Sequence, residues 1–178
     1  MREDLSCIWI SKEQIAEKVK EIAKQLDEDY KDKNPLVVCV LKGAVMFFTD
    51  IIKAMTIPLE IDFMAISSYG NGATSGVVKF VKDLDVSVTG RHVIIIEDII
   101  DTGNTLYYLK NILNGRDPAS VKLCVLLDKY ERREADIKVD YKAFDIRDEF
   151  VVGYGLDYAE KYRNLDEIGV LKREIYEK

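Results

Sequence analysis

The sequence predicts an α/β fold in which a mainly parallel, twisted sheet is flanked by helices. Two observations indicate this class. Several short runs of residues are apolar without a break and rich in Val and Ile, as is typical of strands covered on both faces. These runs alternate with segments suited to helices, an order that favours right-handed strand–helix–strand crossovers. At 178 residues, a single domain spanning residues 1–178 is expected.

The first element expected is a helix that begins after Ser11. Gln14 follows three residues later, as in a capping box, and the next apolar residues recur at helical spacing. A buried strand is then expected over residues 36–41, and a helix over residues 44–55.

An excursion from the sheet is expected next. A second strand over residues 59–66 runs into a stretch with three glycines, residues 67–76, and a returning strand covers residues 77–81. Long loops in compact domains are more often functional than idle, so we expect residues 67–76 to form a mobile, functional loop.

The rest of the chain continues the alternation. The elements expected are a strand over residues 92–96, a turn and helix over residues 97–113, and strands over residues 121–127, 141–146 and 150–152. In open parallel sheets, ligands bind at the carboxyl ends of the strands. Each unusual loop of this chain follows such an end, which predicts a site at that edge.

Charge and composition exclude several classes. The 26 Lys and Arg residues against 32 Asp and Glu give a net charge of −6, which argues against a protein that mainly coats nucleic acid. None of the three cysteines has zinc-site spacing. The N-terminal residues do not resemble a signal peptide, and no apolar run reaches the roughly 18 residues of a membrane helix. We therefore expect a cytoplasmic protein without a membrane partner.

Two adjacent acids follow the strand over residues 92–96. Glu97 and Asp98 are costly to bury unless they meet water, a metal ion or hydroxyl groups. Vicinal ribose hydroxyls, or a hydrated Mg²⁺ bound to them, would suit this pair.

A turn of small polar residues comes next, Asp101, Thr102, Gly103, Asn104 and Thr105. Gly103 permits a tight turn, and the start of a helix offers free backbone N–H groups and a positive dipole end to an anion. Neither the P-loop motif nor G-x-G-x-x-G occurs in this segment. The residues alone therefore predict an anion-binding strand–turn–helix.

Residues 93–106 resemble the phosphoribosyl-pyrophosphate signature of the type I phosphoribosyltransferases. The likeness covers nearly the full chain and is closest to the hypoxanthine and hypoxanthine-guanine enzymes, through residues 41–43, Ser68 and Tyr69, residues 127–129 and residues 150–158. It implies the fold of that family, with a small hood built from the N-terminal residues and about residues 150–178.

The resemblance implies a purine salvage enzyme. It would transfer the 5-phosphoribosyl group from phosphoribosyl pyrophosphate to hypoxanthine, guanine or both, and would release pyrophosphate and the nucleoside monophosphate IMP or GMP. The cofactor implied is Mg²⁺, held by Glu97, Asp98 and Asp157. Glu97 and Asp98 would hold the ribose hydroxyls. Asp101 would lie near the purine N7, and residues 102–105 would bind the ribose 5′-phosphate.

The remaining roles also come from the resemblance. Lys42, Gly43 and Arg163 would bind pyrophosphate, with a non-proline cis peptide before Lys42, and the mobile loop with Ser68 and Tyr69 would close over the reacting centre. In the purine subsite, Lys129 would donate to the 6-oxo group, Phe150 would stack on the base, Val151 would read its edge and Asp157 would lie nearby.

Several alternatives stay open. Asp101 would accept the purine proton or only hydrogen-bond to the base. A regulator on the same fold that contacts RNA or DNA is a second reading, as is a transferase specific for xanthine or a pyrimidine. The family suggests a homodimer or a homotetramer.

Overall fold

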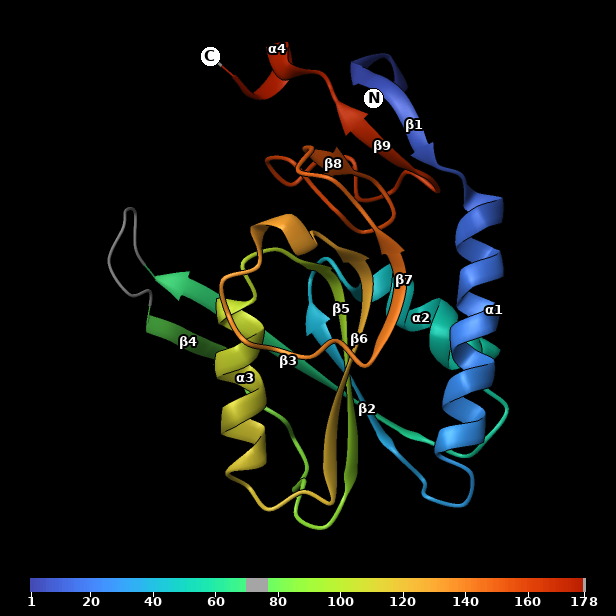
Figure 1. Cartoon of the computed structure of the whole chain (residues 1–178), viewed down its shortest axis with the longest axis vertical. Helices are drawn as coiled ribbons and strands as arrows, with labels where there is room; N and C mark the ends of the chain where they lie inside the picture. The colour runs from blue at the N-terminus through green and yellow to red at the C-terminus, as the bar shows by residue number, and fades with distance from the viewer. Residues whose placement is uncertain (70–76, 178) are drawn as a thin grey trace.

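The computed structural model describes the backbone of residues 1–69 and 77–177, with side chains for residues 1–66 and 80–177. The larger of its two sheets has six strands in the order β4-β3-β2-β5-β6-β7 (Figure 1). All neighbours are parallel except β3 and β4. The strands are β2 (Leu36–Leu41), β3 (Glu60–Tyr69), β4 (Val77–Lys82), β5 (His92–Ile100), β6 (Ser120–Asp128) and β7 (Tyr141–Asp145).

Helices cover both faces of this sheet, as the unbroken apolar strands predict. Along β2, Val37 and Cys39 pack in the cluster that contains α1 (Lys12–Asp29) and α2 (Val45–Ala54). The alternate residue Val38 packs in the cluster of α3 (Asn104–Asn114). Figure 1 shows α1 and α2 on one side of the sheet and α3 on the other. The predicted fold class is confirmed.

The first helix begins as its capping box predicts. The Ser11 hydroxyl accepts from the Gln14 backbone N–H at 3.3 Å, and the Gln14 side chain accepts from the Ser11 N–H at 2.8 Å. All five apolar positions that indicated the helix are buried, namely Ile15, Val19, Ile22, Ala23 and Leu26.

A second, antiparallel sheet forms the hood above the strand ends. Its order is β1-β9-β8, with β1 (Leu5–Ile10), β9 (Ile168–Leu171) and β8 (Val151–Val152). The first and last described segments of the chain lie in this layer, with the short helices η1 (Arg2–Asp4) and α4 (Arg173–Tyr176) (Figure 1). Another short helix, η2 (Tyr130–Arg132), follows β6.

Two strands are longer than the sequence predicts, and this moves site residues out of loops. β3 continues to Tyr69 because the backbones of Ser68 and Tyr69 pair with β4. β5 continues to Ile100 because its register with β6 extends through Glu97. The expectation that this strand ends at residue 66 is therefore wrong, since Ser68 and Tyr69 belong to β3. The rest of the expected mobile loop, residues 70–76, lies outside the described residues.

Within the part of the chain that the structure describes, no helix is long and apolar enough to cross a membrane.

Candidate active site

A cavity of about 370 Å³ lies at the carboxyl ends of β2 and β5. The predicted site residues that line it are Lys42, Gly43, Glu97, Asp98, Asp101, Thr102, Gly103, Thr105, Asp157 and Arg163. These come from four separate stretches of chain, so the fold brings together most of the donor-binding residues that the sequence predicts.

The acid pair lies in the wall of this cavity. The Asp98 N–H donates to Glu97 Oε1 at 3.0 Å, and the Ile99 N–H donates to Asp98 Oδ1 at 2.7 Å. Burial raises the pKa of both carboxyls, that of Glu97 well above its usual range, and the charge of Asp98 raises the Glu97 pKa further. A cation or hydroxyl donors placed between them would relieve this cost.

Two close backbone approaches shape the cavity. A Cβ on Gly43 would lie 1.6 Å from Asp98 Oδ2, and one on Gly155 would lie 2.0 Å from the Gly43 carbonyl oxygen. The peptide bond between Leu41 and Lys42 is cis, as the resemblance implies. Glycine at these two positions therefore lets the turn after β2 lie between the acid pair and the hood.

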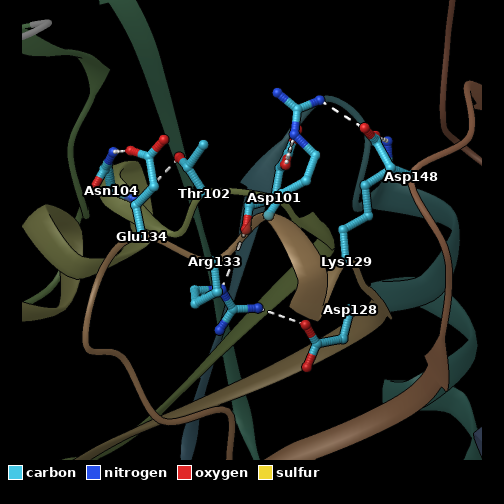
Figure 2. A network of polar contacts seen from close by, with 9 residues as sticks. Asp101, Thr102, Asn104, Asp128, Lys129, Arg133, Glu134 and Asp148 are labelled. Atoms are coloured by element: carbon cyan, nitrogen blue, oxygen red, sulfur yellow. Dashed lines mark hydrogen bonds and ion pairs between the residues drawn. The ribbon is translucent and has the colours of Figure 1, made fainter.

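The small-residue turn leads into the first residues of α3 and is held by a segment for which the sequence predicts no role. Gly103 has φ +82°, and a Cβ there would lie 2.9 Å from Arg133 Cδ. The Thr102 carbonyl accepts from the N–H groups of Glu134 and Ala135 at 2.9 and 3.0 Å. The Asn104 side chain donates to Glu134 at 2.9 Å and does not line the cavity (Figure 2).

Lys42 and Arg163, the cations expected to bind pyrophosphate, both form ion pairs with Glu160. Lys42 Nζ and Arg163 Nη2 lie 3.3 and 3.4 Å from Glu160 Oε2, and Arg163 Nη2 lies 2.9 Å from Asp157 Oδ1. Hydrogen bonding from Lys42 lowers the pKa of Glu160. The sequence carries no signal for Glu160, because its pairing with Lys42 depends on contact between the hood and the turn after β2.

Of the residues expected at the base, Asp157 lines this cavity and the other three do not. Lys129 is only 8% exposed, and its Nζ lies 3.4 Å from Asp148 Oδ1 (Figure 2). The Phe150 ring is stacked on Tyr176 with centroids 4.7 Å apart, and Val151 is buried in β8. None of the three purine-subsite residues Lys129, Phe150 and Val151 lines the cavity.

Two buried side-chain atoms have no hydrogen-bond partner among the described residues, Asp101 Oδ1 and Arg163 Nε. Arg132 Nε lies 3.1 Å from Asp101 Oδ1, which is close enough for an ion pair but lacks hydrogen-bond geometry. Both orphaned atoms belong to residues that line the cavity. Buried polar groups are normally satisfied, so this cavity is built for a polar ligand.

A family model of phosphoribosyl transferase domains matches residues 11–159. The chain belongs to this family. Among its relatives, the hypoxanthine-guanine phosphoribosyltransferase of Streptococcus thermophilus is 53% identical over 100% of this chain and 99% of its own length. The enzyme of the same name from Bacillus subtilis is 53% identical over 99% of each.

Solved structures of the family share the whole fold. A hypoxanthine phosphoribosyltransferase from Staphylococcus aureus superposes with a TM-score of 0.97 at 46% identity, covering 100% of this chain and 97% of that one. The hood and the six-stranded sheet are therefore features that this phosphoribosyl transferase shares with its relatives.

Proposed function

We propose that this phosphoribosyl transferase joins hypoxanthine, guanine or both to the ribose of phosphoribosyl pyrophosphate, as a purine salvage enzyme. One observation carries the proposal: a single cavity gathers the acid pair, the small-residue turn and the cations Lys42 and Arg163, with orphaned polar atoms on two of its walls. The names of the full-length relatives support the choice of base.

The donor would be bound by three groups of residues. Residues 102–105 at the start of α3 would receive the 5′-phosphate, because free N–H groups and the helix dipole favour an anion there. Glu97 and Asp98 would accept from the ribose hydroxyls. Lys42, Gly43 and Arg163 would bind pyrophosphate, which would compete with Glu160 for both cations.

The acid pair fits a divalent cation, which we propose to be Mg²⁺. The described residues bring together no group of three metal-ligating side chains. Mg²⁺ is commonly held by one or two carboxylates together with substrate phosphates and water. Glu97, Asp98 and Asp157, which line the same cavity, would supply the carboxylates. When bound, the ion would neutralise charge on the leaving pyrophosphate.

In the reaction, the bond from C1′ to the pyrophosphate oxygen breaks as the bond from C1′ to a purine nitrogen forms, and the base loses one proton. Positive charge develops on the ribose ring and is stabilised by the fixed acids Glu97 and Asp98. Asp101, whose Oδ1 accepts no hydrogen bond among the described residues, would accept the proton or hydrogen-bond to the base.

Lys129 would select the base. Its ammonium has donors and no acceptor, so it suits a 6-oxo group and leaves a 6-amino group mismatched. Phe150 and Val151 complete the proposed subsite, and preference among hypoxanthine, guanine and xanthine depends on contacts at the 2-position. The closing of Ser68 and Tyr69 over the reacting centre stays a prediction. So do the assembly into a homodimer or homotetramer and the cytoplasmic location.

Pyrophosphate release with Mg²⁺, phosphoribosyl pyrophosphate and each of hypoxanthine, guanine, xanthine and adenine tests the proposal. We expect turnover with the first two bases and little with adenine. Asp101→Asn should lower kcat by about 100-fold or more, the size of a general-base contribution, with the KM for phosphoribosyl pyrophosphate much less affected. Lys129→Ala should weaken the preference for 6-oxo over 6-amino bases. No turnover with any base in the wild-type protein would overturn the proposal.

A further inference from the structure

Two consecutive arginines lie next to the proposed base subsite and have no part in the chemistry above. Arg133 serves the backbone: its guanidinium donates to Asp128 Oδ1 at 2.5 Å and to the Asp101 carbonyl at 3.2 Å, and its Cδ packs against Gly103 (Figure 2). Asp128 is buried, so this pair anchors the small-residue turn to β6.

Arg132 makes a different set of contacts, all with side chains. Its Nε lies 3.1 Å from Asp101 Oδ1, and its Nη1 lies 3.4 Å from Asp148 Oδ1. The same Asp148 oxygen lies 3.4 Å from Lys129 Nζ. Figure 2 shows the Lys129 and Asp148 side chains directed toward one another beside Asp101. Arg132 and Asp148 thus link the two residues, Asp101 and Lys129, that we assign to the purine base.

We propose that Arg132 is a positioning residue of the base subsite, acting with Asp148 to hold the Asp101 carboxylate and the Lys129 ammonium in one arrangement. This inference rests on the proposed function and goes beyond it, because neither Arg132 nor Asp148 has a role in donor binding or in bond making.

The charges of the four groups support this role. Two cations, Lys129 and Arg132, face two anions, Asp101 and Asp148, so the cluster is neutral. Lys129 is nearly buried, and a buried ammonium without a counterion is costly. When a 6-oxo oxygen takes the Lys129 donor, Asp148 keeps Arg132 as its partner. A neutral base therefore enters without leaving a carboxylate unpaired.

The shape of the arginine matters as much as its charge. A guanidinium has five donors in a planar fork and engages two carboxylates at once, whereas a lysine ammonium is a point charge on a flexible stem. Arg132 bridges two acids that come from segments more than forty residues apart in the chain. Lysine at this position would keep the charge and lose the bridge.

Steady-state kinetics on the full chain with Mg²⁺, hypoxanthine and phosphoribosyl pyrophosphate test the inference. For Arg132→Gln we expect the KM for hypoxanthine to rise about fivefold, the upper size of a partly exposed ion pair, with the KM for phosphoribosyl pyrophosphate within about twofold. The KM of Arg132→Lys for hypoxanthine should lie between that of the wild type and that of Arg132→Gln. Arg147→Gln is the matched control, since this exposed arginine makes no side-chain ion pair among the described residues.

A double-mutant cycle with Asp148→Asn separates positioning from a general loss of stability. If Arg132 acts through Asp148, the double variant should lose no more than the worse single variant. The unfolding temperatures of all variants, measured in parallel, should agree with the wild type within a few degrees. Three outcomes would each overturn the inference: additive losses in the double variant, equal changes in both KM values, or an Arg132→Gln variant that behaves like Arg147→Gln. In each case turnover by the wild-type protein would still uphold the proposed function. An inactive wild-type protein would overturn both.

Discussion

Gly43 has no room for a side chain on the face toward Asp98. A Cβ there would lie 1.6 Å from Asp98 Oδ2, and the Gly43 carbonyl is itself covered by Gly155. The backbone cannot move away from Asp98 without meeting the hood. A methyl group at this position must therefore displace the Asp98 carboxylate, which we assign to the ribose and the metal ion.

Gly43→Ala should lower kcat/KM for phosphoribosyl pyrophosphate by about 100-fold, because displacing a positioned group by about 1 Å costs that much. Gly115→Ala is the control: its φ is −70°, and an added Cβ would meet only ordinary contacts at 3.4 Å or more. Steady-state kinetics of both variants check the expectation. Wild-type kinetics in Gly43→Ala would show that the close approach of Gly43 does not position Asp98.

Glu97 makes the free protein less stable as the pH rises. The unfolded chain loses the Glu97 proton near the usual pKa, whereas burial and the Asp98 charge hold it on the folded protein to higher pH. Between these two pKa values the folded state binds more protons, so stability falls with increasing pH. A neutral side chain at this position would remove that loss.

Glu97→Gln should therefore melt at a higher temperature than the wild type near neutral pH in EDTA, by about 2–4 °C for each 1 kcal/mol. The difference should shrink toward about pH 4, where the wild-type carboxyl keeps its proton. Mg²⁺ and phosphoribosyl pyrophosphate should raise the melting temperature of the wild type more than that of the variant. Glu17→Gln, on the exposed face of α1, is the control. It should change neither the melting temperature in EDTA nor the rise caused by Mg²⁺ and phosphoribosyl pyrophosphate. A melting temperature for Glu97→Gln below that of the wild type would contradict the conclusion that the Glu97 carboxyl destabilises the free protein near neutral pH.

The sequence identifies residues whose role is local, and it misses those whose role depends on distant contacts. Glu97 and Asp98 were predictable because two acids directly follow an apolar strand. Arg132, Asp148 and Glu160 were not, since each is a charged residue in a polar segment with no spacing signal. Their pairings join segments that only the folded chain brings together.

At the scale of elements, the order and type were predictable and the strand ends were not. Apolar runs predict the middle of β3 and β5, but neighbouring strands hold the last residues of both. Ser68 of β3 pairs with β4, and Glu97 of β5 pairs with β6. The pairing of one strand with another cannot be predicted from the pattern of neighbouring residues in the sequence. The hood was expected only from the family resemblance, because its two longer strands come from opposite ends of the chain.

A buried hydrogen bond links the hood to the helical layer. The buried Tyr154 hydroxyl donates to Asp50 on α2 at 2.7 Å. Tyr154→Phe should lower the free energy of unfolding by about 0.5–1.5 kcal/mol, the net contribution of one hydrogen bond. Urea unfolding measures this. Tyr130→Phe, which removes an exposed hydroxyl 3.4 Å from Glu131, should change it by less than about 0.5 kcal/mol. Equal effects in the two variants would contradict the role of the Tyr154 contact.

At the scale of the whole molecule, the hood and the six-stranded sheet share one apolar core. Ile10, Val151 and Ile168 of the hood strands pack in the same buried cluster as Phe47 of α2 and Ile94 of β5. The site itself lies between these layers, with Asp157 and Arg163 on one side and Glu97 and Asp98 on the other. A shared core couples the stability of the two layers, so we expect the chain to unfold as a single domain.

The single tryptophan makes this expectation testable, because Trp9 lies in β1 and packs against the shared cluster. Trp9 fluorescence reports the hood, and far-ultraviolet circular dichroism reports all the helices and strands. In urea, both signals should give the same midpoint and slope, as two-state unfolding requires. Mg²⁺ and phosphoribosyl pyrophosphate should move both midpoints upward together, since a ligand held between the layers stabilises both. A fluorescence transition at lower urea than the dichroism transition would mean that the hood unfolds separately, and the chain would then consist of two units with the site at their boundary.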